Sequence, residues 1–106
     1  MGYYWVMFEI IKTETFDAWL AGLKDRQAVQ RVLARLDRVR LGNLGDAKFL
    51  RDGVSEMRID YGAGYRLYFT KREGVLVILL CAGDKRTQDK DIEAAIQLAK
   101  HWEIKK

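Results

Sequence analysis

The chain has 106 residues, 49% of them hydrophobic and 11% aromatic, with a formal net charge of +4 and a sequence pI near 9.3. This composition excludes an intrinsically disordered chain, and the length favours a single domain over residues 1–106 with its own hydrophobic core. The positive charge favours polyanionic partners, a bias that many ordinary proteins share. One cysteine and one histidine exclude an internal disulfide and a cysteine-based zinc cluster, so we expect neither metal nor cofactor.

The N-terminal stretch MGYYWVMFEII is mostly apolar and is followed by Lys12. It is too short to span a bilayer, which needs about 20 apolar residues, and it lacks a basic leader and a cleavage site. We therefore expect a cytoplasmic protein without membrane contact. Aromatic and β-branched residues predict a first strand from Tyr4 to Ile11. Residues 1–6 are expected to be an extension, since Met7 could equally begin the domain.

Two helices are predicted next. The first begins after an N-cap at Thr13 or Thr15 and ends around residues 22–24. Asp25 can cap the second helix, which we expect over residues 26–41. The apolar stripe of this second helix is Val29, Val32, Leu33, Leu36 and Val39.

The other face of the second helix is rich in arginine. Arg31, Arg35 and Arg38 are spaced at i, i+4 and i+7, so they line up along the helix. A solvated face of an amphipathic helix is the more frequent reason for such a pattern. The alternative is an electrostatic contact with a nucleic-acid backbone, and no feature of the sequence decides between the two.

A run of β elements follows the glycine-containing loop at residues 42–45. The first element places Lys48 and Arg51 before a turn at Asp52-Gly53. Tight glycine turns separate the later strands. The last strand is apolar without alternation, as expected for a strand that is buried on both faces. The four predicted segments cover residues 46–51, 54–61, 65–70 and 75–81.

A final helix is predicted from about Thr87, a reasonable N-cap, with Asp89 and Asp91 near the positive end of the helix dipole. The element order is β-α-α-β-β-β-β-α. It predicts an α+β fold in which two N-terminal helices and one C-terminal helix pack on a mostly antiparallel sheet, with the helices on one side.

Basic residues inside the strands are the unusual feature of this sequence. Period-two alternation places Glu56 and Arg58 on one face of their strand, and an antiparallel hairpin would bring Arg66 to the same face. Lys85 and Arg86 directly follow the apolar strand. The arginines either occupy a solvated face, where Arg58 and Glu56 would form an ion pair of little value to stability, or line a cradle for a phosphate-bearing partner.

Three phrases of the sequence resemble a known family. They are LGNLGD at residues 41–46, SEMRIDYGAGYRLYF at residues 55–69 and LCAGDKRTQ at residues 80–88. With the element order, they resemble the RelE/ParE superfamily of toxins from type II toxin–antitoxin systems, and within it the HigB-like addiction-module killer proteins. The resemblance covers nearly the whole chain from Met7.

The resemblance implies a ribosome-dependent mRNA endonuclease that inhibits translation and arrests growth. Catalytic roles are implied for Arg66, Arg58, Glu56 and Lys85, with Glu56 at a position where some relatives carry a proton acceptor. Thr87 and its neighbours stand where many relatives carry a tyrosine or histidine, so the general acid is left open. The further residues expected to contact RNA are Lys48, Arg51, Arg86, Arg31, Arg35 and Arg38.

The resemblance leaves a second activity open, because ParE-like members inhibit DNA gyrase without cutting RNA. The expected partners are a cognate antitoxin, a small helix-turn-helix protein, together with the ribosome and mRNA, or gyrase in the alternative. His101 lies late on the final helix, away from the expected site, so a two-histidine ribonuclease mechanism is excluded.

Overall fold

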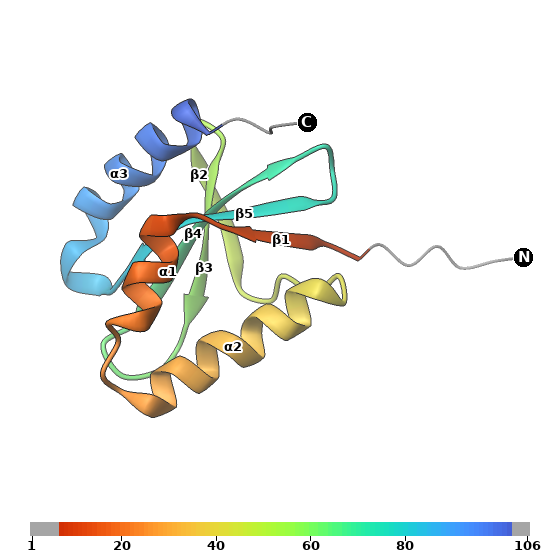
Figure 1. The fold of residues 1–106 in the computed structure, drawn as a ribbon. Coiled ribbons are helices and arrows are strands. Elements are labelled where there is room, and N and C mark those ends of the chain that lie inside the picture. The colour runs from red at the N-terminus through yellow and green to blue at the C-terminus, as the bar shows by residue number, and fades with distance from the viewer. Residues whose placement is uncertain (1–6, 103–106) are drawn as a thin grey trace, which may run out of the picture.

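The computed structural model describes residues 7–102, and these form an α+β domain of three α-helices on a five-stranded sheet (Figure 1). The expected fold class is therefore confirmed. Residues 4–6 of the expected first strand lie outside the described residues. In chain order the elements are β1 Glu9–Lys12, α1 Glu14–Ala21, α2 Arg26–Arg40, β2 Ala47–Arg51, β3 Val54–Ile59, β4 Tyr65–Arg72, β5 Leu76–Gly83, the 3-10 helix η1 Lys85–Thr87 and α3 Gln88–His101.

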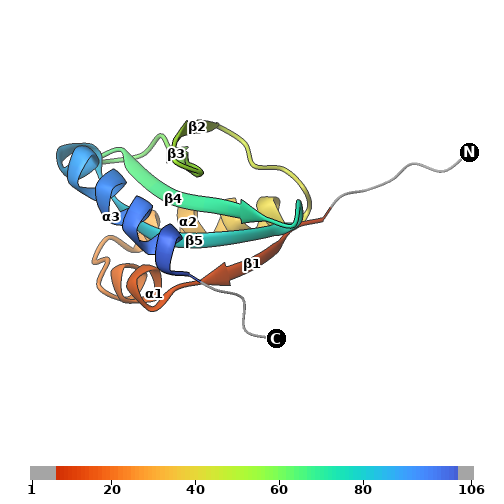
Figure 2. The same ribbon diagram turned by 90° about the horizontal axis from the view of Figure 1, so that it is seen from above.

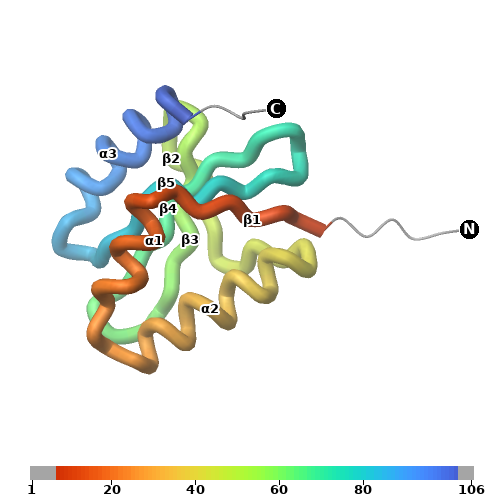
Figure 3. The backbone as a smooth tube through the Cα atoms, in the orientation of Figure 1, coloured from red at the N-terminus to blue at the C-terminus, as the bar shows by residue number. Residues whose placement is uncertain are grey.

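The strands are ordered β1-β5-β4-β3-β2. Strands β2 to β5 form an antiparallel meander, as their tight glycine turns predict, whereas β1 pairs with β5 in parallel. The backbone trace shows β1 running alongside β5, although the two are far apart in the sequence (Figure 3). No helix among residues 7–102 is both long enough and apolar enough to cross a lipid bilayer.

Side-chain caps begin the first two helices as the sequence predicts. The hydroxyl of Thr13 accepts a hydrogen bond from the backbone N–H of Phe16, and the carboxylate of Asp25 accepts from two N–H groups of α2. Thr87 does not cap α3, contrary to expectation. Its hydroxyl instead donates a 2.6 Å hydrogen bond to the carboxylate of Asp91, one turn into the helix.

The helices cover both faces of the sheet, so the expectation that they lie on one side was wrong (Figures 1 and 2). Val77 and Leu79 of β5 pack in one core with α1 and α2. Ile78 and Leu80 pack in a second core against α3. Every residue of β5 is buried, because successive side chains of a strand point to opposite faces and each face here has its own helical cover.

A β-bulge in β5 changes which of its residues reach the α3 face. Tyr68 of β4 pairs with Cys81, but the next residue, Phe69, pairs with Leu79, so Leu80 is extra. Leu80 and Cys81 therefore both belong to the α3 core. After the bulge, Gly83 lies opposite Arg66, which brings the chain that leaves β5 to the arginine.

Candidate functional site

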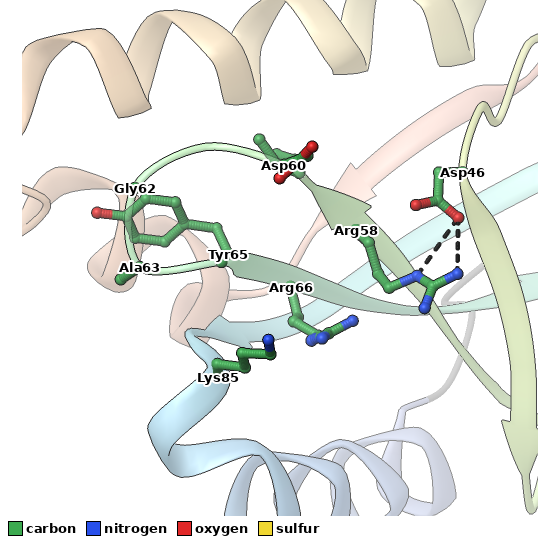
Figure 4. Close-up of a pocket in the computed structure, with 10 residues that line it drawn as sticks. Asp46, Arg58, Asp60, Gly62, Ala63, Tyr65, Arg66 and Lys85 are labelled. Atoms are coloured by element: carbon green, nitrogen blue, oxygen red, sulfur yellow. Dashed lines mark hydrogen bonds and ion pairs between the residues drawn. The ribbon is translucent and has the colours of Figure 1, made fainter.

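A cleft of about 400 Å³ lies where the β3–β4 turn meets the end of β5. Three of the four residues expected to be catalytic, Arg58, Arg66 and Lys85, line it (Figure 4). They come from β3, β4 and η1. Lys85 extends toward Arg66, and the guanidinium of Arg66 extends toward the side of Arg58 (Figure 4). Its other lining residues are Asp46, Ile59, Asp60, Gly62, Ala63, Gly64 and Tyr65.

Arg58 and Arg66 share one face of the hairpin, as alternation predicts, and are direct partners in the β3–β4 register. Two guanidinium groups on one face repel each other, so each needs an anionic partner. The carboxylate of Asp46 accepts hydrogen bonds from Nη2 and Nε of Arg58 at 3.0 and 3.3 Å. Both side chains of this ion pair are exposed, so a ligand can reach them.

Arg66 pairs with Glu56 of the neighbouring strand β3 and not with a residue that lines the cleft. Nη1 of Arg66 lies 3.5 Å from Oε1 of Glu56, and the two side chains are 12% and 3% exposed. Glu56 faces the α3 side of the sheet and does not line the cleft. The sequence placed Glu56 on the same face as the arginines, which is confirmed, but the face is covered at this point instead of solvated.

Lys85 reaches the cleft because η1 is attached to the β3–β4 turn. The backbone N–H of Lys85 donates to the carbonyl of Ala63. Gly64, at a φ of +77°, lies under the aliphatic stem of Lys85, whose Cβ and Cδ would be 3.7 Å from any Cβ added at that glycine. The glycine turn thus leaves room for the side chain of Lys85 to extend over Gly64 into the cleft.

Arg35 contradicts the exposed arginine face expected on α2. It is 8% exposed, and its guanidinium donates hydrogen bonds to three backbone carbonyls, those of Leu44, Asp46 and Arg58. Burial lowers the pKa of Arg35, and the charge of Asp46 partly offsets this effect. Arginine remains charged nevertheless, so Arg35 is a structural cation that binds backbone oxygen atoms.

Arg31 and Arg38 remain at the surface of α2, on either side of Arg35. They line a hollow of about 260 Å³ that shares Ile59 and Asp60 with the main cleft. The guanidinium of Arg31 lies 4.5 Å from the centre of the Tyr61 ring, a cation–π contact that fixes its direction. The second hollow thus places two exposed arginines of α2 next to the main cleft, and the buried Arg35 also lines it.

The remaining basic residues expected at the site lie outside the cleft. Arg51 pairs with Glu93 of α3 and with Asp52. Arg86 is 83% exposed and pairs with Asp84, whose carboxylate has its pKa lowered by the hydrogen bonds that it accepts from Arg86. Lys48 is exposed on the edge strand β2, opposite Glu56 in the register.

Sequence reasoning gave no role to Asp46, Asp60 or Tyr65, all of which line the cleft. A signal for Asp46 was present, because it ends the LGNLGD phrase. Its contact with Arg58 joins positions that are 12 residues apart and depends on how β2 pairs with β3. Within residues 7–102, no group of three histidine, cysteine, aspartate or glutamate side chains is placed to hold a metal ion.

Two further polar side chains, those of Tyr68 and Cys81, are buried in the core that α3 covers. Burial, aided by the charge of Glu56, raises the pKa of Tyr68 well above its ordinary value. Burial also raises the pKa of the Cys81 thiol to about 12, so this cysteine is an inert core residue, as its apolar surroundings in the sequence predict.

The fold and the cleft define a small α+β protein with a cationic site at one end of an antiparallel hairpin. Residues 18–102 match the family described as "Phage derived protein Gp49-like (DUF891)", and the chain belongs to this family, which is of the RelE-like toxin type. A protein of Haemophilus influenzae described as uncharacterized is 54% identical over 91 residues, which cover 86% of this chain and 92% of that protein.

Proposed function

We propose that this protein is the toxin of a toxin–antitoxin pair and that it cleaves mRNA on the ribosome. One observation carries the proposal. The cations of Arg58, Arg66 and Lys85 come from three different elements and meet in a single cleft. Three converging donors of positive charge suit a phosphodiester, which gains charge on its non-bridging oxygens during cleavage.

The chemistry assigns different tasks to these cations. The exposed guanidinium of Arg58 can bind phosphate oxygens through paired N–H donors, whereas Arg66 offers only the part of its guanidinium other than the buried Nε and Nη1. Arginine does not give up a proton at physiological pH. An ammonium group gives up a proton more readily than a guanidinium group does, so Lys85 is the cation among the three that suits this task. Lys85 is therefore our candidate for protonating the leaving 5′-oxygen.

The site offers few groups that carry protons, which supports a reaction that depends on a large partner. The ribosome would fix the message so that the 2′-hydroxyl is in line with the scissile phosphate, and positioning alone can supply roughly 7–11 kcal/mol of a barrier. As the 2′-oxygen bonds to phosphorus its proton passes to solvent water, and the bond from phosphorus to the 5′-oxygen breaks as that oxygen takes a proton from Lys85. The hollow between Arg31 and Arg38 adjoins the cleft and would hold a neighbouring part of the RNA backbone. The cognate antitoxin is the proposed partner that keeps the cleft inactive.

Expression without an antitoxin tests the proposal in cells. The wild-type chain should arrest growth and stop the incorporation of labelled methionine before that of labelled thymidine. Arg66→Ala should abolish the arrest, whereas Arg40→Ala, which changes an exposed arginine of α2 outside the cleft, should retain it. Circular dichroism of both variants establishes that each is folded.

The opposite order of events would favour gyrase as the target. In that case thymidine incorporation would stop first, DNA damage signalling would rise and translation would continue. Growth arrest that persists in Arg66→Ala would also contradict a role for the cleft.

A further inference from the structure

The side chain of Glu56 lies next to Arg66 on the same face of the sheet, outside the cleft in which a substrate would bind. It is 3% exposed and does not line the cleft, although it lies on the same sheet face. A general base must come within about 2.6–3.2 Å of the proton that it removes, or reach it through one water. A carboxylate that is this deeply buried and does not line the cleft does not meet this requirement.

Glu56 contacts Arg66, which lines the cleft. Its Oε1 is 3.5 Å from Nη1 of Arg66, a distance typical of an ion pair rather than of a hydrogen bond. The two residues are diagonal neighbours on adjacent strands, since Glu56 pairs with Tyr68 and Arg66 pairs with Arg58. Diagonal neighbours on one face are within reach of long side chains.

Several polar atoms around this contact are buried and have no hydrogen-bond partner among residues 7–102. They are Oε2 of Glu56, Nε and Nη1 of Arg66 and the hydroxyl of Tyr68. A buried guanidinium is stable only where a negative charge compensates for its lost hydration. Glu56 supplies that charge from the neighbouring strand, and the part of the guanidinium that is not buried faces the cleft.

We propose that Glu56 is a positioning residue that holds Arg66 in the direction needed to bind phosphate, and that it does not act as the base. This inference rests on the proposed function only for the identity of the ligand. In this role the carboxylate contacts the guanidinium of Arg66, and no proton is transferred to it during the reaction.

The experiment compares Glu56→Gln with the wild type and uses Tyr68→Phe as the matched control. The Glu56→Gln substitution keeps the shape of the side chain and removes its charge, while the control removes a neighbouring buried hydroxyl that has no partner among the described residues. A 2′-deoxy oligonucleotide serves as the binding probe, because it carries phosphates but lacks the 2′-hydroxyl that cleavage needs. Nuclear magnetic resonance of the Arg66 Nε–H group reports the guanidinium directly.

We expect Glu56→Gln to weaken oligonucleotide binding roughly 10- to 100-fold, the scale on which a misplaced binding group acts. The Arg66 Nε–H signal should shift and exchange faster with water. The pH profile of any residual cleavage should keep its wild-type shape. Glu56→Asp, which keeps the charge, should recover most of the binding, and Tyr68→Phe should match the wild type.

Two outcomes would overturn the inference. One is unchanged binding together with loss of cleavage and of the acidic limb of the pH profile, because that combination identifies a base. The other is an Arg66 signal that is the same in Glu56→Gln as in the wild type. The signal can be read even if the chain cleaves no RNA, so failure of the proposed function and failure of this inference are distinguishable. If Glu56→Gln does not fold, Glu56→Asp is read in the same assays and must bind the probe nearly as the wild type does.

Discussion

Nη1 of Arg35 donates a 2.7 Å hydrogen bond to the carbonyl oxygen of Arg58. Nη2 of the same guanidinium donates to the carbonyl of Asp46, also at 2.7 Å. The side chains of Asp46 and Arg58 form the ion pair at the cleft, so a buried arginine on α2 fixes the backbone of both members. The cleft therefore depends on a residue that is not part of its lining.

Arg35→Lys should lower the free energy of unfolding by about 2–4 kcal/mol. The ammonium group of lysine lacks the planar fork of N–H donors through which Arg35 binds three backbone carbonyls. Buried carbonyls that lose their donor carry a desolvation penalty. Urea unfolding at pH 7 measures the change. Arg38→Lys, on the exposed part of the same helix, is the control and should stay within about 0.5 kcal/mol of the wild type. Equal small effects in both variants would show that the Arg35 contacts contribute little.

Gly45→Ala should destabilise the protein more than Gly74→Ala. Both glycines have positive φ, +67° and +74°, so the backbone strain is nearly matched. A Cβ at position 45 would lie 2.8 Å from Nε of Arg35, whereas nothing lies within 4 Å of one at position 74. We expect a difference of about 1–3 kcal/mol in thermal unfolding experiments, the usual cost of overpacking. Equal losses would mean that Arg35 moves aside freely.

Asp46→Asn should strengthen the binding of an oligonucleotide that cannot be cleaved. The change removes a carboxylate that occupies the guanidinium of Arg58, and it raises the charge of the cleft by one. The pair is exposed, so the gain should be modest, up to about fivefold at low salt. Fluorescence anisotropy measures the binding, and Asp37→Asn, in an exposed pair with Arg40 on α2, serves as the control. Weaker binding by Asp46→Asn would show that Asp46 orients Arg58 for the ligand instead of competing with it.

Stability should fall in alkaline solution because of Cys81. Burial raises the pKa of this thiol from 9.0 to about 12, so the folded protein keeps a proton that the unfolded chain loses. The contribution is fully present below pH 9 and is lost as the pH rises from 9 to 12. At pH 10 the loss should be about 1 kcal/mol relative to pH 8. Cys81→Ala, compared by urea unfolding at the two values, should show a smaller decrease, and an equal decrease would contradict this assignment.

The elements could be predicted because their signals are local. Thr13 and Asp25 cap helices through hydrogen bonds that span two or three residues, and the glycine turns fix the antiparallel meander. The shared face of Arg58 and Arg66 follows from alternation and from one hairpin register. The full burial of β5 was also predicted from its unbroken apolar run, although the helices were expected on one side of the sheet only.

The parts that could not be predicted depend on contacts between distant segments. Helical spacing aligned Arg35 with Arg31 and Arg38, but the loop before β2 covers Arg35 alone. The bulge at Leu80 is not marked by glycine or proline, and it decides that Gly83 lies opposite Arg66. Glu56 is buried on the face of the sheet that α3 covers, and no local pattern specified that α3 lies on this second face.

The most direct test of the cationic cleft is cleavage of a ribosome-bound message by the purified protein, read by primer extension. The wild type and Arg40→Ala should create new 5′ ends within codons, and Arg66→Ala should create none. A message that stays intact with the wild type, in the presence of ribosomes and under conditions where the same protein inhibits supercoiling by gyrase, would contradict the proposed activity.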